Sequence, residues 1–155
     1  MLDDLFSYGS KSLDRLAYQT ALDEIAADAS VGTGFSLDVL KEHFDRGVAL
    51  IADNLINPAF PEDAFKVVQK ETASLLAGQE KSPNWLSGRK LSEALLPEKD
   101  PALRYARPET VSKLTLEDVK GYYTTVFRPD LTTIVIIGNI EPAKAKAVIE
   151  KYFGG

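Results

Sequence analysis

The spacing of apolar residues over the first sixty positions predicts two helices separated by a strand. From Ser12 to Ala29, apolar side chains recur every three or four residues, which is typical of a helix with one buried face. From Val31 to Val39, apolar positions alternate with small or polar ones, as in a half-buried strand. Helical spacing then runs from Leu40 to Pro58, where the proline ring would end the helix.

Further helices are predicted in the second half of the chain. One apolar stripe runs from Pro61 to about Gly78, and a new helix begins at Ser82, which we expect to act as its N-cap. Pro97 to Pro108 contains three prolines and has no steady period, so we expect an irregular surface loop. After it, Thr115–Asp118 has the spacing of a capping box at the start of another helix.

The segment "TTIVIIG", Thr132 to Gly138, predicts a second strand that ends in a tight glycine turn before a helix opened by Pro142. A nucleotide-binding loop would need several glycines or a Gly-Lys-Ser/Thr sequence, so we interpret Gly138 as scaffold. Two strands make only a marginal sheet, which indicates that part of the sheet is missing from this chain. We therefore expect residues 1–155 to form a single domain, as a fragment of a longer multi-domain protein.

Composition excludes several functional classes. A formal charge of -5 provides no basic surface for nucleic acid or for anionic membranes, and no apolar run approaches the roughly 20 residues of a membrane span. The chain has no cysteine, which excludes disulfides, thiolate metal sites and cysteine nucleophiles. A cysteine-free chain suits the bacterial cytoplasm and the periplasm equally.

Residues with catalytic potential do not form a recognisable constellation. The single histidine, His43, cannot supply the two imidazoles that zinc peptidases place on one helix, and we interpret it as a surface residue. No Gly-x-Ser-x-Gly sequence is present, and the adjacent acidic pairs suit helix N-termini. We therefore predict no catalytic, cofactor-binding or metal-binding residue. Arg104, Tyr105 and Trp85 are interpreted as ordinary surface and helix-anchoring residues.

Several ordered phrases resemble the insulinase and mitochondrial-processing-peptidase family, the pitrilysin-type zinc peptidases with an inverted motif. The resemblance runs nearly end to end and is carried by their order. The phrases are "LFSYGSKS", "ASVGTGFSLD", "NLINPAFPEDAF", "TLEDVKGYY", "FRPD", "IVIIGNIEPAKA" and "KYFGG". The resemblance implies an α+β fold with helices packed on one face of an antiparallel or mixed sheet. It also implies flanking strands that this chain lacks.

The resemblance also implies an inert domain. Active members carry His-x-x-Glu-His shortly before a Gly-Thr step, which Gly9–Ser10 matches here. The last two positions of that motif are Asp3 and Asp4, and the position of a later glutamate ligand falls near Ser74, within a turn of Glu71. The substrate-gripping Arg and Tyr of active relatives lie downstream of this segment, so Arg104 and Tyr105 are not their counterparts.

The functional prediction is a non-catalytic domain of an insulinase-type zinc peptidase, with no cofactor of its own. Its expected partners are a zinc-bearing peptidase domain, in the same chain or in another subunit, and an unfolded peptide enclosed between the two. Open sheet edges also predict a homodimer of the segment. Two alternatives stay open: part of an active zinc metalloendopeptidase whose ligands lie outside this segment, or an assembly subunit without protease activity.

Overall fold

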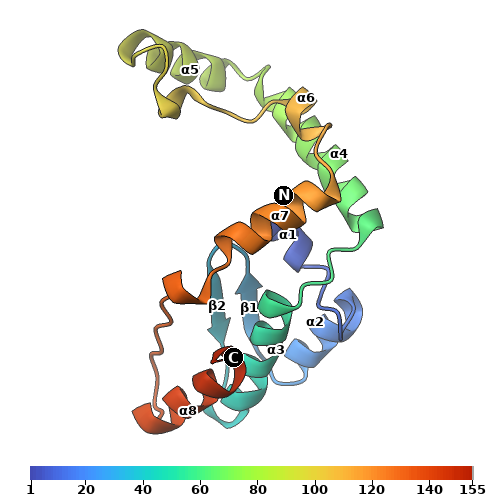
Figure 1. The fold of residues 1–155 in the computed structure, drawn as a ribbon, viewed down its shortest axis with the longest axis vertical. Coiled ribbons are helices and arrows are strands. Elements are labelled where there is room, and N and C mark those ends of the chain that lie inside the picture. Colours follow the sequence, from blue (N-terminus) through green and yellow to red (C-terminus); the bar gives the residue numbers. More distant parts are fainter. Residues whose placement is uncertain (155) are drawn as a thin grey trace.

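The computed structural model describes residues 1–154, apart from the side chain of Pro129. Helices dominate it, and one small antiparallel sheet completes the fold (Figure 1). In chain order, its elements are α1 (Leu2–Phe6), α2 (Arg15–Asp23), β1 (Asp28–Val31), β2 (Phe35–Asp38), the short 3-10 helix η1 (Lys41–His43), α3 (Phe44–Ile56), α4 (Glu62–Gln79), α5 (Pro83–Leu95), η2 (Pro101–Leu103), α6 (Pro108–Val111), α7 (Leu116–Val126), η3 (Pro129–Leu131) and α8 (Pro142–Phe153). The predicted α+β class is confirmed. No helix within residues 1–154 combines the length and apolar character needed to cross a bilayer.

The first predicted helix is shorter than expected. Asp14 caps α2 by accepting a hydrogen bond from the backbone N–H of Ala17 at 2.8 Å, and the helix ends at Asp23. Ala26 then adopts a left-handed backbone with φ of 48°, which a continuing helix does not allow. Asp28 and Ala29, predicted as the end of that helix, belong to β1 together with Val31, which was predicted as strand. Strand β1 pairs with β2, with Ala29 opposite Leu37 and Val31 opposite Phe35.

Other boundaries follow the predictions closely. The helix expected from Pro61 is α4, and Pro142 occupies the first turn of α8. Thr115 and Asp118 form the predicted capping box in full, each side chain accepting a hydrogen bond from the other's backbone N–H. Ser82 is the residue before α5, but its side chain makes no capping hydrogen bond. The loop from 97 to 108 contains the one-turn element η2.

Aromatic rings hold the main core together. Phe6 lies at its centre, with ring centroids of Phe60, Tyr123 and Phe127 at 5.4, 6.1 and 5.3 Å. Because Phe6 comes from α1 and Tyr123 from α7, this cluster joins segments more than a hundred residues apart. The Tyr123 hydroxyl also donates to the backbone oxygens of Leu55 and Ile56, at 2.7 and 3.1 Å, and so satisfies the C-terminal carbonyls of α3.

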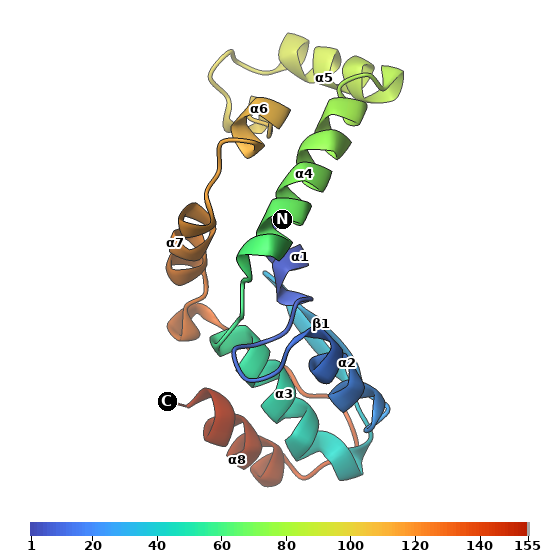
Figure 2. The ribbon, with the colours of Figure 1, turned by 90° about the vertical axis from the view of Figure 1, so that its right-hand side faces the viewer.

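The molecule divides into two parts that differ in burial. We call residues 75–107 the arm: it contains the end of α4, then α5 and η2, and it projects from the rest of the molecule (Figure 1). Figure 2 shows α5 lying across the end of α4. The remaining described residues, 1–74 and 108–154, form the body. All the buried residues lie in the body, whereas every residue of the arm is at least partly exposed.

The structure departs most from the sequence prediction at Thr132–Gly138, which was predicted as a strand. Residues 132–137 are extended, but no strand pairing is assigned to them, and the sheet consists of β1 and β2 alone within the described residues. They run from η3 towards α8, to one side of β2 (Figure 1). The predicted strand is therefore wrong: among the described residues, 132–138 are assigned to no strand.

Candidate functional site

A groove of about 690 Å³, lined by both apolar and polar atoms, lies between β2 and residues 132–137. Helices α3 and α8 form its floor, through Val48, Ile51 and Leu55 from α3 and Ile149 and Phe153 from α8. Phe35 of β2 stacks on Phe153 of α8, with ring centroids 6.1 Å apart and planes at 17°. We call this hollow the sheet-edge groove.

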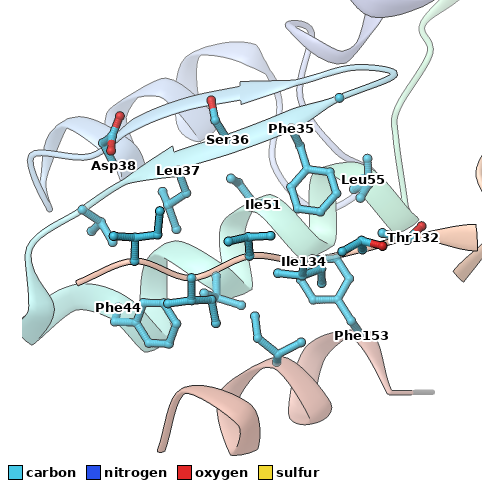
Figure 3. A pocket seen from close by; sticks show the side chains of 18 of the residues that line it. Phe35, Ser36, Leu37, Asp38, Phe44, Ile51, Leu55, Thr132, Ile134 and Phe153 are labelled. Atoms are coloured by element: carbon cyan, nitrogen blue, oxygen red, sulfur yellow. The ribbon is translucent and has the colours of Figure 1, made fainter. Parts of the chain in front are cut away.

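Alternation along β2 determines which side chains face the sheet-edge groove. Phe35 and Leu37 are half-buried and point towards α3, whereas Ser36 and Asp38 are exposed and point away from it (Figure 3). Opposite them, Ile134 is half-buried, but Val135 and Ile137 are 75% and 93% exposed. Exposed apolar side chains of residues 132–137, next to this groove, therefore leave considerable hydrophobic area in contact with water.

Asp3 and Asp4, which the resemblance places at the last two motif positions, lie on α1 and are exposed. Asp3 holds the turn between β1 and β2: its carboxylate accepts hydrogen bonds from the Thr33 backbone N–H at 2.8 Å and from the Thr33 hydroxyl at 3.3 Å. Asp4 forms an ion pair with the N-terminal amine of Met1. Both carboxylates therefore have structural roles.

Gly9, which matches the glycine of the Gly-Thr step, requires glycine for two reasons. Its φ is +89°, and a Cβ atom there would lie 2.3 Å from the backbone oxygen of Leu13. Ser10 next to it is buried, and its hydroxyl donates to Asp53 of α3 at 2.5 Å. This turn fixes the end of α1 against α3. Gly138, in contrast, has open space around its Cβ direction and no positive φ, so the predicted requirement for glycine there is wrong.

The other acidic and histidine candidates are not brought together. His43 is half-exposed at the end of η1, and Glu71 and Ser74 are exposed on α4. Among residues 1–154, no group of three or more His, Asp or Glu side chains is close enough to hold a metal ion. A zinc site needs at least three protein ligands, so the described residues offer none.

Trp85 and Tyr105 do contact each other, which sequence reasoning missed. Their rings meet edge to face at 5.4 Å, and the Arg89 guanidinium lies 3.5 Å from the centroid of the Tyr105 ring. Arg107 lies over the same ring at 4.9 Å. Arg89 also donates to the Leu103 carbonyl at 3.3 Å and pairs with Glu93 at 2.9 Å. The cluster attaches the loop around η2 to α5, and Arg104 is exposed beside it.

Tyr18 of α2 is buried, and the Asp53 carboxylate of α3 is near enough to influence its hydroxyl. Burial, together with the nearby Asp53 carboxylate, raises the pKa of Tyr18 to about 12. Its hydroxyl has no hydrogen-bond partner among the described residues. Because the group stays protonated throughout the physiological range, it offers no acid–base chemistry near neutral pH.

No sequence signal located the sheet-edge groove itself. The pattern of residues 132–138 predicted a strand, and the low strand count predicted an incomplete sheet. Neither observation showed that the gap would fall between β2 and this segment, because strand order within a sheet depends on contacts between residues far apart in sequence.

Comparison with known proteins gives matches to peptidases and their inactive relatives. Residues 113–155 match the model of the family described as "Peptidase M16 inactive domain". The curated Helicobacter pylori protein named "Non-peptidase homolog YmxG" is 24% identical over an alignment of length 141, and the alignment covers 86% of this chain and 32% of that protein.

Solved structures share the fold over almost the whole chain. A protease from Helicobacter pylori aligns over 98% of this chain and 38% of its own, with a TM-score of 0.79 and 16% identity. The periplasmic protease PqqL from Escherichia coli aligns over 97% of this chain and 18% of its own, with a TM-score of 0.72 and 13% identity. The chain thus spans about a third of the length of the curated relative it matches.

Proposed function

Because the chain resembles the M16 peptidases, which are the insulinase-type family, and matches their inactive domain over residues 113–155, we propose that it is a non-catalytic partner of a zinc-bearing peptidase domain. The zinc-bearing domain, in the same polypeptide or in a separate subunit, carries the chemistry. This chain contributes shape and contact surface, and the two together enclose an unfolded peptide.

The main observation behind this proposal is that the Asp3 carboxylate accepts hydrogen bonds from Thr33. By resemblance, Asp3 stands where active members have a motif residue, and here its carboxylate is engaged by the backbone and hydroxyl of Thr33. A Cβ atom on Gly32 would lie 2.9 Å from the Asp3 carboxyl carbon, so the turn is packed closely against this side chain. Asp3 therefore supports a turn at the position where active members carry the motif glutamate, which acts as the general base.

Metal analysis of the purified chain tests the proposal. We expect zinc well below one equivalent after exposure to excess zinc and desalting, because no set of three ligands is assembled in residues 1–154. The Asp3→Asn variant should retain the same low zinc content, since the aspartate holds a turn and not a metal. Stoichiometric zinc, together with peptide cleavage abolished by a chelator, would overturn the proposal and favour the active-fragment alternative.

A second experiment tests whether the chain has a zinc-bearing partner. Affinity purification of the tagged chain from its own cells should recover a polypeptide that contains His-x-x-Glu-His. The name of the Helicobacter relative, a non-peptidase homologue, favours a second candidate, an assembly subunit without a protease partner. Recovery of stable partners that all lack this motif would support that second candidate instead.

A further inference from the structure

Charge is distributed unevenly between the arm and the rest of the chain. Residues 75–107 contain six basic and four acidic side chains, so the arm carries a charge of +2. Because the whole chain carries -5, the remaining residues carry -7. The arm projects from the body (Figure 1), and at an ionic strength of about 0.1 M charges farther apart than about 10 Å are largely screened. A molecule at the arm therefore meets mainly the positive charge of the arm itself.

Two arginines of the arm have no acidic partner. Glu93 already pairs with both Arg89 and Lys90, at 2.9 and 2.8 Å. Arg104 and Arg107, in contrast, are exposed and form no ion pair within residues 1–154. Their positive charge is therefore free to attract an anionic group from another molecule.

The half-buried ring of Tyr105 orients one of these two arginines. The Arg107 guanidinium lies over this ring, 4.9 Å from its centroid, and the Arg89 guanidinium holds the ring in place at 3.5 Å. A guanidinium stacked on an aromatic ring keeps the N–H groups at its edge, which match the two oxygens of a carboxylate. Arg104 lies on the same extended stretch of backbone, three residues before Arg107. Together they offer two neighbouring sites for carboxylates.

From these observations we propose that Arg104 and Arg107 bind side-chain carboxylates of an acidic segment in a second polypeptide, which lies along the exposed stretch 104–107. The proposal goes beyond the pairing with a zinc-bearing domain, because it depends only on the charge and geometry of the arm. It gives both arginines a role beyond the ordinary surface role that the sequence alone indicates.

Other anions fit this surface less well. A small-molecule site buries most of its ligand, whereas the side chains of Arg104 and Arg107 are exposed. Duplex nucleic acid carries one negative charge per roughly 1.7 Å of its length, so the acidic body repels any part of a duplex that extends beyond the arm. A short acidic segment carries fewer charges and can contact the arm alone.

The flanking strands that this chain is expected to lack do not compete for this surface. Strands added beside β1 or β2 would extend the sheet, which lies in the body, whereas residues 75–107 contain no strand. A second copy of the chain is disfavoured as well. Each copy carries a charge of -5, so two copies repel each other.

A labelled synthetic peptide tests the proposal. The probe has about ten residues, enough to pass both arginines in an extended conformation, and contains several glutamates among glycine and serine. The control peptide has glutamine in place of each glutamate. At an ionic strength of about 0.1 M, fluorescence anisotropy should show saturable binding to the whole chain, about tenfold tighter for the glutamate peptide. Equal binding of the two peptides would overturn the proposal.

Variants of the chain locate the binding surface. Because exposed ion pairs are individually weak, Arg104→Gln and Arg107→Gln should each weaken binding about threefold, and the double variant about tenfold. Arg15→Gln is the matched control, since Arg15 is also exposed and lies over a tyrosine ring, that of Tyr8 at 5.1 Å, but belongs to the body. It should leave binding unchanged. Circular dichroism confirms that the variants are folded, and equal binding by the double variant and the control would overturn the proposal.

Three further measurements distinguish other occupants. Displacement of the peptide by an equal concentration of inorganic phosphate would indicate a site for small anions. Tighter binding of a short DNA duplex than of the glutamate peptide would indicate nucleic acid, and self-association that is lost in the double variant would indicate a second copy. Each of these results would overturn the proposal. We expect no displacement by phosphate, weaker binding of DNA, and the same sedimentation coefficient with and without the two substitutions.

Discussion

Helices α3 and α5 have the same length but opposite environments. Each has 13 residues, yet α3 contributes seven buried residues to the body and α5, in the arm, contributes none. Leu91 and Leu95 of α5 are 60% and 73% exposed. The difference shows that the body is stabilised by its own core, whereas the arm depends on local contacts and on the helix α4 that carries it.

The largest expected effect comes from the centre of the body. Phe6→Ala should lower the free energy of unfolding by about 3–5 kcal/mol, because it opens a cavity among the rings of Phe60, Tyr123 and Phe127. Leu91→Ala in the arm should change it by less than about 0.5 kcal/mol. Urea denaturation followed by far-UV circular dichroism measures both. Equal losses in the two variants would show that the arm has a core of its own.

An intermediate effect is expected at the cluster that attaches the η2 loop to α5. Tyr105→Leu removes the ring on which Arg89 and Arg107 stack, a loss of about 1 kcal/mol of local stability. Backbone amides around residues 101–107 should then exchange about fivefold faster, while the midpoint of global unfolding stays the same. Tyr122→Leu, an exposed tyrosine of the body, is the matched control and should leave exchange in the arm unaltered.

The smallest expected effect is a response to acid. Hydrogen bonds from Tyr152 and then Lys151 lower the pKa of Asp45, and a hydrogen bond from Lys90 lowers that of Glu93. Both carboxyls therefore favour the folded state above their unfolded pKa values, about 3.9 and 4.3, and this contribution is lost as pH falls through the lower folded values.

The structural consequences of acid should differ between the two parts. Asp45 joins α3 to α8, whereas Glu93 pairs with Lys90 and Arg89 inside α5. Carboxyl carbon shifts followed by NMR should give both midpoints below the usual values. Amide shifts of α8 should follow Asp45, and those of the body should not follow Glu93. A titration midpoint of Asp45 at its ordinary value would show that its contacts with Lys151 and Tyr152 of α8 do not form in solution.

Local sequence signals predicted most of the helices and the fold class. The capping box at Thr115 and the proline at 142 acted through neighbouring backbone groups, which a sequence displays directly. The same reasoning failed at Asp28 and Ala29, because the left-handed turn at Ala26 is made by a residue with no special preference for it. Pairing with β2, which is a tertiary contact, decided that segment.

The candidate site was less predictable than the fold. Asp3 was identified as a replaced motif position by resemblance, but its role in holding the Thr33 turn depends on a contact across thirty residues. The stacking of Arg89 on Tyr105 likewise joins α5 to a loop that had no readable period. The sheet-edge groove depends on four segments, β2, α3, residues 132–137 and α8, so no local pattern could reveal it.

Helix α4 belongs to both parts of the molecule. Its first turns bury Ala64, Phe65 and Val68 in the core. The whole helix of 18 residues is roughly 27 Å long, and its end reaches into the arm without a break. Midway along it, Gln69 donates to the carbonyl oxygens of Val111 and Leu114, at 3.0 and 2.7 Å. A continuous rod held at its base and at a midpoint behaves as a lever. Displacement of its tip would apply torque to the aromatic cluster around Phe6.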